Sequence, residues 1–440
     1  MFACSTLTSP VFWVFFTLLL FSVCGEMFLN ALNAKRMRSK TPLAGYFIEK
    51  DRLENIGSWL DVLFWGLLLP GGLFPVYSAF LEKTIPSTGE KIASMLFFAG
   101  FFFLRFLLQI PPAFRKTILS EREYGYGHTS MAQFFADQGK CLLLGGFFSG
   151  AAGFLLVFLL KKAGQTACLL YFPLSALLFL LAADFFAPYI LHLFFQVKNP
   201  EDPILEKEAE AILSRGGFRM KGLKILDFSS RTNHANAFLS GTGCSRKIFL
   251  SDTLKKILTR EELLAVIAHE TAHGVGKHRE KLFAIQAAGL ILILPLCSLM
   301  LKDFWIFQQF YPEVSSSVSA STLNPDPGTL PPFVFETEIL LCLFVLESTL
   351  WILLPLFNLF CRHCEFEADR MASDFCGGPE KLISALRKLL NDPLPEGVHP
   401  LYKAFKCRHP SFSEREALLL KLEKRNHGHS PEITGGTRFS

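Results

Sequence analysis

The stretch AVIAHETAHGVGKH, residues 265–278, places two histidines four residues apart with a glutamate directly after the first. On a helix, side chains four residues apart lie on one face, so His269 and His273 can bind one zinc ion together. Glu270 is rotated by about 100° from His269, which suits a general base that accepts the proton of an attacking water. The alternative is a chance match on a polar helix surface. The pattern favours a hydrolytic zinc site.

The helix that carries these residues has a clear predicted start. Thr259 and Glu262 fit a capping box, and the neighbouring Leu258 and Leu263 can form a hydrophobic staple. No helix breaker follows until Gly274. We therefore expect the motif to be helical, as its chemistry requires.

Most of the remaining chain is typical of a membrane protein. Half of its 440 residues are apolar, 47 are Phe and only 19% are charged. The sequence predicts an all-α integral membrane protein with seven transmembrane helices, each long enough to cross about 30 Å of hydrocarbon. The seven apolar stretches are residues 10–32, 57–81, 92–114, 141–160, 167–196, 282–301 and 333–360.

The distribution of basic residues predicts the orientation in the bilayer. Basic residues at 35–40 follow the first apolar stretch and none precede it, which indicates a retained helix rather than a cleaved signal peptide. The Lys/Arg-rich segments 33–56, 115–140 and 197–280 and the C-terminal tail fall on one side, whereas residues 305–332 contain no Lys or Arg. That side is predicted to be cytoplasmic, with the N-terminus outside or lumenal. The net charge of +5 reflects this orientation, so no nucleic-acid partner is expected.

Two polar blocks on the cytoplasmic side are predicted to form one small α+β domain, split by the last helical hairpin. The first block contains the HETAH helix and two predicted strands, LKILDF (223–228) and KIFL (247–250). The predicted division is residues 1–197 for spans one to five, 198–280 for the first block, 281–360 for spans six and seven, and 361–440 for the second block.

A hydrolytic zinc site needs a third protein ligand and an open position for water. The best candidate is the cluster CRHCEFEADR, residues 361–370, directly after the seventh span. On a continuing helix Glu365 and Asp369 share a face, while Glu367 points roughly 200° away from Glu365. Glu365 can then be a ligand, and Asp369 can accept the free N–H of a ligand histidine. The alternative is a solvated charged face after a membrane helix.

HETAH and EFEAD on either side of a transmembrane hairpin resemble the M48 zinc metallopeptidases. The seven spans are more similar to the Ste24-type CAAX prenyl proteases than to the shorter HtpX-type quality-control proteases. Three further segments are similar to that family: EREYGYGHTS at 121–130, residues 227–254, and CRHPSFSERE at 407–416. The resemblance covers nearly the whole chain. It implies a multi-pass zinc metalloendopeptidase of the endoplasmic reticulum or a bacterial cell membrane.

The resemblance also implies a cofactor, a substrate class and a set of site residues. It implies one Zn²⁺ per chain, peptide or protein substrates that include prenylated proteins, and spans that enclose a chamber, which Arg105 and Glu347 fit. The implied zinc ligands are His269, His273 and Glu365. The other implied roles are Glu270 as general base, Asp369 as outer partner of the ligands, His409 as an oxyanion donor, and Asn236, Ala237 and Arg415 as residues of the substrate cleft.

The chain departs from the family pattern beside the motif. Thr271 and Ala272 stand where Leu-Gly is usual, and Gly274 stands where an aromatic residue is usual. These departures are expected to alter the wall of the site. His278, five residues after His273, is expected to be a helix-end cation rather than a ligand.

Three functions are compatible with the sequence. The first is processing of C-terminal CAAX peptides of prenylated proteins, and the second is degradation of membrane proteins in an HtpX-like quality-control role. The third is a non-catalytic seven-span transporter or scaffold in which HETAH is structural. Peptide hydrolysis that depends on Glu270 distinguishes the first two functions from the third.

Overall fold

The structure is a computed structural model, and the chain divides into two compact units. Unit 1 comprises Met1–Phe185, Phe283–Phe357 and Gly397–Lys406, and unit 2 comprises Phe186–Leu282, Asn358–Glu396 and Cys407–Ser440. Residues 397–406 therefore belong to unit 1, although the sequence analysis assigned them to the second polar block. The described residues are 10–37, 44–68, 73–85, 89–163, 165–217, 222–241, 246–301, 333–389 and 397–427.

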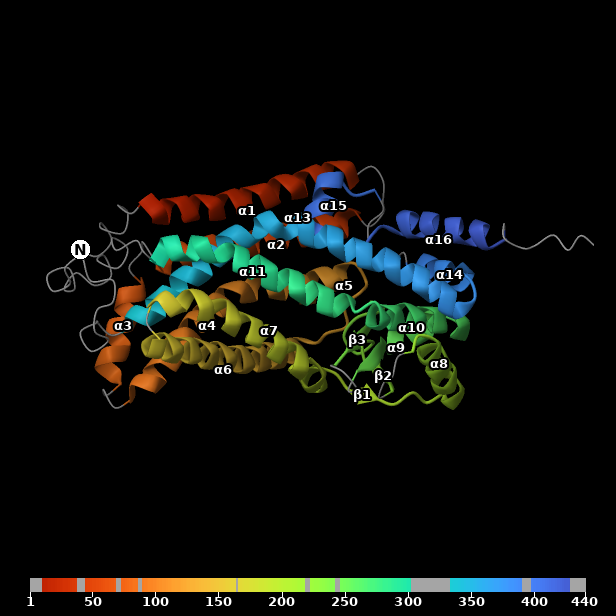
Figure 1. Ribbon diagram of the computed structural model, residues 1–440, viewed down its shortest axis with the longest axis horizontal. Helices are drawn as coiled ribbons and strands as arrows, with labels where there is room; N and C mark the ends of the chain where they lie inside the picture. Colours follow the sequence, from red (N-terminus) through yellow and green to blue (C-terminus); the bar gives the residue numbers. More distant parts are fainter. Residues whose placement is uncertain are drawn as a thin grey trace, which may run out of the picture. The chain divides into compact units, whose positions relative to one another are not determined.

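The described part of unit 1 consists of helices, several of them long (Figure 1). Three long helices, α7 (Gln165–Phe194), α11 (His278–Leu301) and α13 (Val334–Cys376), each have residues in both units. The helices wholly within unit 1 are α1 (Pro10–Met37), α2 (Ala44–Leu68), α3 (Leu73–Thr84), α4 (Glu90–Phe114), η4 (Arg115–Ser120), α5 (Glu121–Glu123), α6 (Met131–Ala163) and α15 (Pro400–Lys406).

The predicted count of seven spans is met only in part within the described residues. Four helical stretches are long and apolar enough to cross a membrane, and a bent pair within α7 allows a fifth. The predicted span at 57–81 covers the end of α2, the beginning of α3 and the residues between them, which the structure does not describe. It therefore does not correspond to one described helix. The segment 305–332 also lies outside the described residues. The four spans are Phe12–Met37, Lys91–Glu123, Met131–Leu159 and Ile339–Cys376.

Close packing of α4 against α6 depends on glycine. A methyl group on Gly150 of α6 would lie 2.9 Å from the backbone oxygen of Met95 on α4, and one on Gly153 would overlap the ring of Phe98. Small residues let membrane helices approach each other in this way. The aromatic side chains of α4 also pack against the start of α13, where the rings of Phe97 and Phe333 stack at 5.3 Å.

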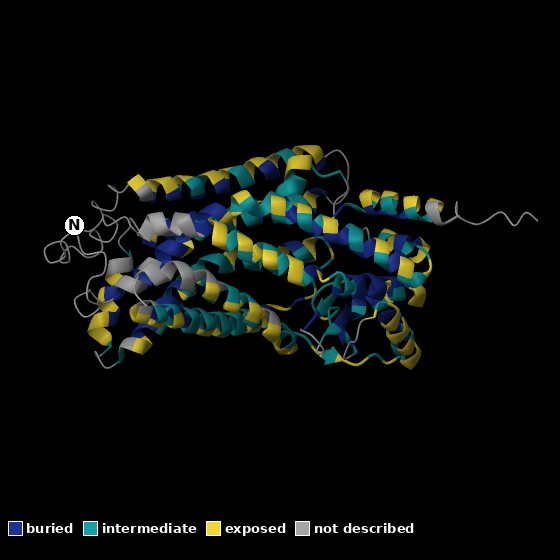
Figure 2. Ribbon diagram, viewed as in Figure 1, coloured by how far each residue is buried: buried dark blue, intermediate teal, exposed yellow. Residues whose placement is uncertain are grey.

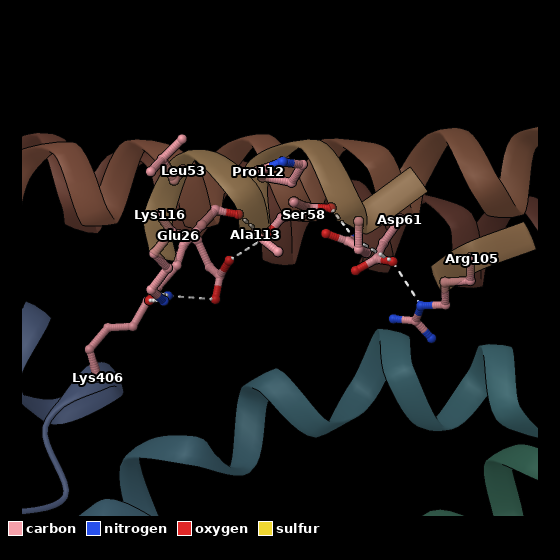
Figure 3. A pocket seen from close by; sticks show the side chains of 12 residues that line it. Glu26, Leu53, Ser58, Asp61, Arg105, Pro112, Ala113, Lys116 and Lys406 are labelled. Atoms are coloured by element: carbon pink, nitrogen blue, oxygen red, sulfur yellow. Dashed lines mark hydrogen bonds and ion pairs between the residues drawn. The ribbon is translucent and has the colours of Figure 1, made fainter. Parts of the chain in front are cut away.

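Ionisable side chains of unit 1 pair with one another. Arg105 on α4 donates to Asp61 Oδ1 at 2.8 Å and to Glu347 Oε1 at 2.6 Å, and Trp65 donates its indole N–H to Glu347 Oε2 at 2.8 Å. Arg105 and Asp61 line a pocket of about 490 Å³ (Figure 3). Ionisable groups in membrane segments are expected to face such an interior rather than lipid.

Replacing Arg105 with methionine is expected to destabilise unit 1, because two carboxylates lose their shared counter-ion. Breaking a fully buried pair costs about 3–5 kcal/mol. The Arg105 side chain is 40% exposed, so we expect a smaller loss of about 1–2 kcal/mol. The measurement is the melting temperature of the chain in detergent. Lys91→Met on the same helix, at an exposed position, is the control and should melt like the wild type.

Unit 2 is built around a four-stranded sheet with the order β1-β2-β4-β3. β2 and β4 are parallel, whereas β1 and β3 pair antiparallel at the two edges. The predicted strands are confirmed as β2 and β4. The strands are β1 (Val197–Lys198), β2 (Leu223–Leu226), β3 (Ala237–Ser240) and β4 (Lys247–Ser251). The helices wholly within this unit are α8 (Pro203–Arg215), α9 (Asp252–Ile257), α10 (Arg260–Val275), α14 (Glu380–Lys388) and α16 (Phe412–His427).

Helix α10 carries HETAH and is buried along most of its length (Figure 2). The predicted capping box is present: Glu262 N–H donates to Thr259 Oγ1 at 3.4 Å, and Thr259 N–H donates to Glu262 Oε2 at 2.7 Å. Glu262 also accepts hydrogen bonds from Ser384 and Lys388 of α14, both at 2.7 Å. Burial raises the pKa of Glu262, but the hydrogen bonds from Lys388, Ser384 and the Thr259 backbone more than offset it, so the pKa falls to about 2.

Glu262→Gln is expected to destabilise the chain by about 1–3 kcal/mol at neutral pH, because a charge-assisted cap and a buried partner for Lys388 are lost. The folded-state pKa of Glu262 lies below its ordinary 4.5. This stabilisation is therefore present above about pH 4.5 and is lost as the pH falls toward 2. Melting curves from pH 7 to pH 3 should show the difference between wild type and variant shrinking. The control Glu261→Gln, at a side chain 65% exposed, should change little at any pH.

Candidate metal centre and active site

Helices α10 and α13 bring the three predicted ligands together. The Nε2 atoms of His269 and His273 lie 3.1 Å apart. Glu365 places Oε2 at 3.5 Å from the first of these nitrogens and Oε1 at 3.4 Å from the second. Ligands at about 2.0–2.1 Å from a tetrahedral zinc ion are separated by about 3.3–3.4 Å. Each pair of these side chains therefore approaches to within about the distance that separates two zinc ligands, and one donor atom from each of the three lies within 4.8 Å of the others, as a His/His/Glu donor set.

A second layer of charges holds the first ligand. Asp369, which is fully buried, places Oδ1 at 3.0 Å from Nδ1 of His269. Arg415 binds both carboxylate oxygens of Asp369, at 2.6 and 2.8 Å. Burial lowers the pKa of His269, but hydrogen bonds to Asp369 and Glu365 more than offset it, so the pKa rises to about 10. The carboxylates that raise this pKa also favour a metal cation, which must displace a proton from His269 in order to bind.

Glu270 follows the first ligand and is half-buried on α10. Burial raises its pKa above the ordinary value, while the neighbouring His269 and His273 oppose that rise. A carboxylate whose pKa is shifted toward neutrality is a more effective general base near pH 7. His409 places Nδ1 at 3.1 Å from Oε1 of Glu365, and its side chain is 53% exposed. It is thus a polar group on the solvent side of the ligands.

The three predicted cleft residues have different surroundings. Asn236 is exposed and directly precedes β3. Its backbone oxygen accepts a hydrogen bond from Ser251 N–H at 2.8 Å, and its own N–H donates to Ser251 Oγ at 2.9 Å. Ala237 is the first residue of β3, at the edge of the sheet. Arg415 is only 8% exposed, and its guanidinium is bound to Asp369. The structure therefore places Arg415 behind the ligands rather than in an open cleft.

The departures from the family pattern lie in the protein core. Thr271 and Ala272 are both fully buried, and Thr271 donates its hydroxyl to the backbone oxygen of Ile267 at 2.7 Å. Gly274 is buried as well. On α10 these residues are covered by the protein rather than by solvent.

His278 and Glu367 lie near the ligands, in surroundings that helical spacing alone does not predict. His278 is only 2% exposed and places Nδ1 at 2.8 Å from Nδ1 of His273. Burial lowers its pKa to about 4, so it is neutral, and the expectation of a helix-end cation is wrong. Its Nε2 lies 3.3 Å from Oε2 of Glu367. That expectation assumes that one helix continues from His273 to His278, but α10 ends at Val275 and the chain turns before α11 begins. The signal present in the sequence is His278 itself, a third histidine five residues after the HETAH motif.

Comparisons with known proteins agree with this geometry. Residues 200–423, which include every residue of the metal centre, match the model of peptidase family M48. The chain belongs to peptidase family M48. Residues 42–196 match a second model, described as CAAX prenyl protease N-terminal, five membrane helices. This M48 chain is thus a multi-pass membrane metallopeptidase, and membership of the family implies a metal.

Relatives of this M48 peptidase are found across eukaryotes. A CAAX prenyl protease 1 homolog of Dictyostelium discoideum is 29% identical over 78% of each chain. A homolog of Arabidopsis thaliana is 25% identical over 84% of each chain. CAAX prenyl protease 1 of Saccharomyces cerevisiae is 24% identical over 74% of this chain and 72% of its own. The crystal structure of S. mikatae Ste24p has a TM-score of 0.80 at 21% identity and covers 94% of this chain and 99% of that one, which shows a shared fold.

Proposed function

We propose that this chain is a zinc metalloendopeptidase that hydrolyses peptide bonds, with one Zn²⁺ held by His269, His273 and Glu365. The observation that supports the proposal best is the approach of these three side chains: the two Nε2 atoms lie 3.1 Å apart, and each lies 3.4 or 3.5 Å from one carboxylate oxygen of Glu365. Bound zinc would supply Lewis acidity, which makes water nucleophilic near neutral pH and polarises a carbonyl oxygen. Asp369 orients His269 and is itself fixed by Arg415, so we assign Arg415 a positioning role.

The remaining side chains perform the proton transfer and hold the substrate. Glu270 accepts the proton of the attacking water and later delivers it to the leaving amine. His409, on the solvent side of Glu365, donates to the developing oxyanion. Asn236 and Ala237 begin the edge strand β3, which aligns an extended substrate by strand addition. No covalent intermediate with the protein is required.

Prenylated proteins with a C-terminal CAAX peptide are the proposed substrates. Two observations support this class: the match to the CAAX prenyl protease N-terminal model and the names of the relatives, which are CAAX prenyl proteases. A prenyl chain partitions into a bilayer, because each buried CH₂ contributes about 0.8 kcal/mol. A protease with several membrane helices meets such a substrate at the membrane surface.

The proposed topology retains the predicted division of the chain. Seven helices cross the bilayer and enclose a chamber, with the N-terminus outside or lumenal. The α+β peptidase domain, formed by 198–280 and 361–440 with the exception of residues 397–406 of unit 1, and the C-terminus are cytoplasmic. The excess of Lys and Arg in the cytoplasmic segments supports this orientation.

The test uses the purified chain in liposomes with two synthetic peptides of one CAAX sequence, one farnesylated and one not. We expect cleavage of the farnesylated peptide, located by mass spectrometry, to be at least about tenfold faster. A chelator should stop both reactions, and added zinc should restore them. Equal rates on both peptides, with rapid cleavage of a misfolded membrane protein, would instead favour the quality-control role. No cleavage of any substrate by the zinc-loaded chain would favour the scaffold.

A further inference from the structure

The two ligand histidines differ in what lies behind them. Behind His269 is a carboxylate, Asp369, at 3.0 Å. Behind His273 is another imidazole, because Nδ1 of His278 lies 2.8 Å from Nδ1 of His273. The two rings are nearly perpendicular, at 81°, with centroids 4.9 Å apart. This contact joins the HETAH helix to the first residue of α11.

The position of the metal centre fixes the protons in this contact. Nε2 of His273 faces His269 and Glu365, so it is the nitrogen that offers a lone pair to a metal, and Nδ1 carries the proton. Nδ1 of His278 must then accept that proton's hydrogen bond. The remaining proton of His278 is on Nε2, which lies 3.3 Å from Glu367 Oε2, close enough for charge attraction but not aligned as a hydrogen bond. Glu367 is in turn 3.4 Å from Nζ of Lys281.

The turn between the two helices is shaped around the His278 ring. Gly276 has φ −68°, which any residue adopts, but a methyl group there would lie 2.8 Å from Cδ2 of His278 and would also overlap Nε2. Lys277 then takes φ 52°, in the left-handed region, and turns the chain so that His278 returns over His273. The backbone thus leaves space for an imidazole at this place.

We infer that His278 is a positioning residue for the metal: it orients His273 by accepting a hydrogen bond from its Nδ1–H, and the nearby carboxylate of Glu367 favours the tautomer of His278 that can accept. This inference rests on the proposed zinc centre and adds His278 and Glu367 to it. Outer partners of ligand histidines fix ring orientation and tautomer, and their loss typically weakens metal affinity by about 10–100-fold.

The experiment measures the zinc dissociation constant of the full-length chain in detergent, by competition with a chelating indicator. His278→Phe keeps a ring of similar size without an acceptor, and we expect zinc binding to weaken by about 10–100-fold. His278→Asn places an acceptor oxygen where Nδ1 stood, and it should bind zinc within about threefold of the wild type. If the role of His278 were purely structural, the zinc dissociation constants of these two variants would not differ in this way.

Gly276→Ala tests the same inference without altering any polar group. The added methyl group displaces the His278 ring, so this variant should weaken zinc binding as His278→Phe does. Its matched control is Gly289→Ala on α11, where a methyl group would meet only Leu353 Cδ1 at 3.6 Å, and that variant should bind zinc like the wild type. Gly276→Ala also decides the question if His278→Phe does not fold.

The outcomes separate this inference from the zinc centre itself. If wild type binds zinc and His269→Ala does not, while His278→Phe or Gly276→Ala binds as tightly as wild type, the role of His278 is overturned and the zinc centre stands. The same holds if His278→Asn is as weak as His278→Phe. If wild type binds no zinc, or His269→Ala binds it equally well, the zinc centre is itself overturned.

Discussion

Glu270→Gln is expected to retain zinc and to lose peptide hydrolysis by about 10³-fold in kcat, within the range that general-base catalysis contributes. Glutamine has the same shape as glutamate but cannot accept the proton of the attacking water. The three donor atoms of the metal centre come from His269, His273 and Glu365, so metal binding should be unaffected. The measurement is kcat on a CAAX peptide together with the zinc content of the same preparation.

Glu261→Gln is the matched control for this variant. Glu261 lies on the same helix, and its exposed side chain pairs only at the surface with Lys381. It should hydrolyse peptide at the wild-type rate. Wild-type hydrolysis by Glu270→Gln would eliminate Glu270 as the general base, and loss of zinc from it would mean that Glu270 belongs to the ligand set.

Glu365→Gln should lose both the metal and the activity. The substitution removes the only carboxylate from the His/His/Glu donor set, and a neutral amide oxygen is a much weaker ligand for Zn²⁺ than a carboxylate. It also removes the negative charge that lies 3.1 Å from His409. We expect zinc affinity to fall by at least about 100-fold and hydrolysis to fall to background. The zinc dissociation constant and kcat are measured side by side, and excess zinc should restore part of the activity.

Asp374→Asn provides the control on α13. Asp374 is an exposed carboxylate on the same helix, beyond the metal centre, and its neutralisation should leave zinc affinity and hydrolysis unchanged. If Glu365→Gln keeps full zinc affinity, the third ligand must be another residue, with His409 the nearest alternative. The contrast between Glu270→Gln and Glu365→Gln then distinguishes a base from a ligand.

Features that depend on local sequence were predictable. The start of α10 follows from Thr259 and Glu262, and the shared face of His269 and His273 follows from helical spacing within one unbroken segment. Glu365 and Asp369 were predictable for the same reason, because α13 continues without a break through the EFEAD motif to Cys376. Each prediction required only the geometry of a regular helix.

Features that depend on a change of direction or on packing were not predictable in this way. The role of His278 was missed because the left-handed Lys277 turns the chain between α10 and α11. The burial of Arg415 depends on Asp369, which is 46 residues away in the sequence.

Arg415 and His269 both bind the carboxylate of Asp369, although they lie 146 positions apart in the chain. A ribosome that adds about 5–20 residues per second needs roughly 7–30 s to pass from one to the other. During that interval the HETAH helix exists without Glu365, then without the arginine that fixes Asp369. A nascent chain that ends before Arg415 therefore lacks the residue that fixes Asp369, and we expect its metal centre to stay incomplete until Arg415 has been added.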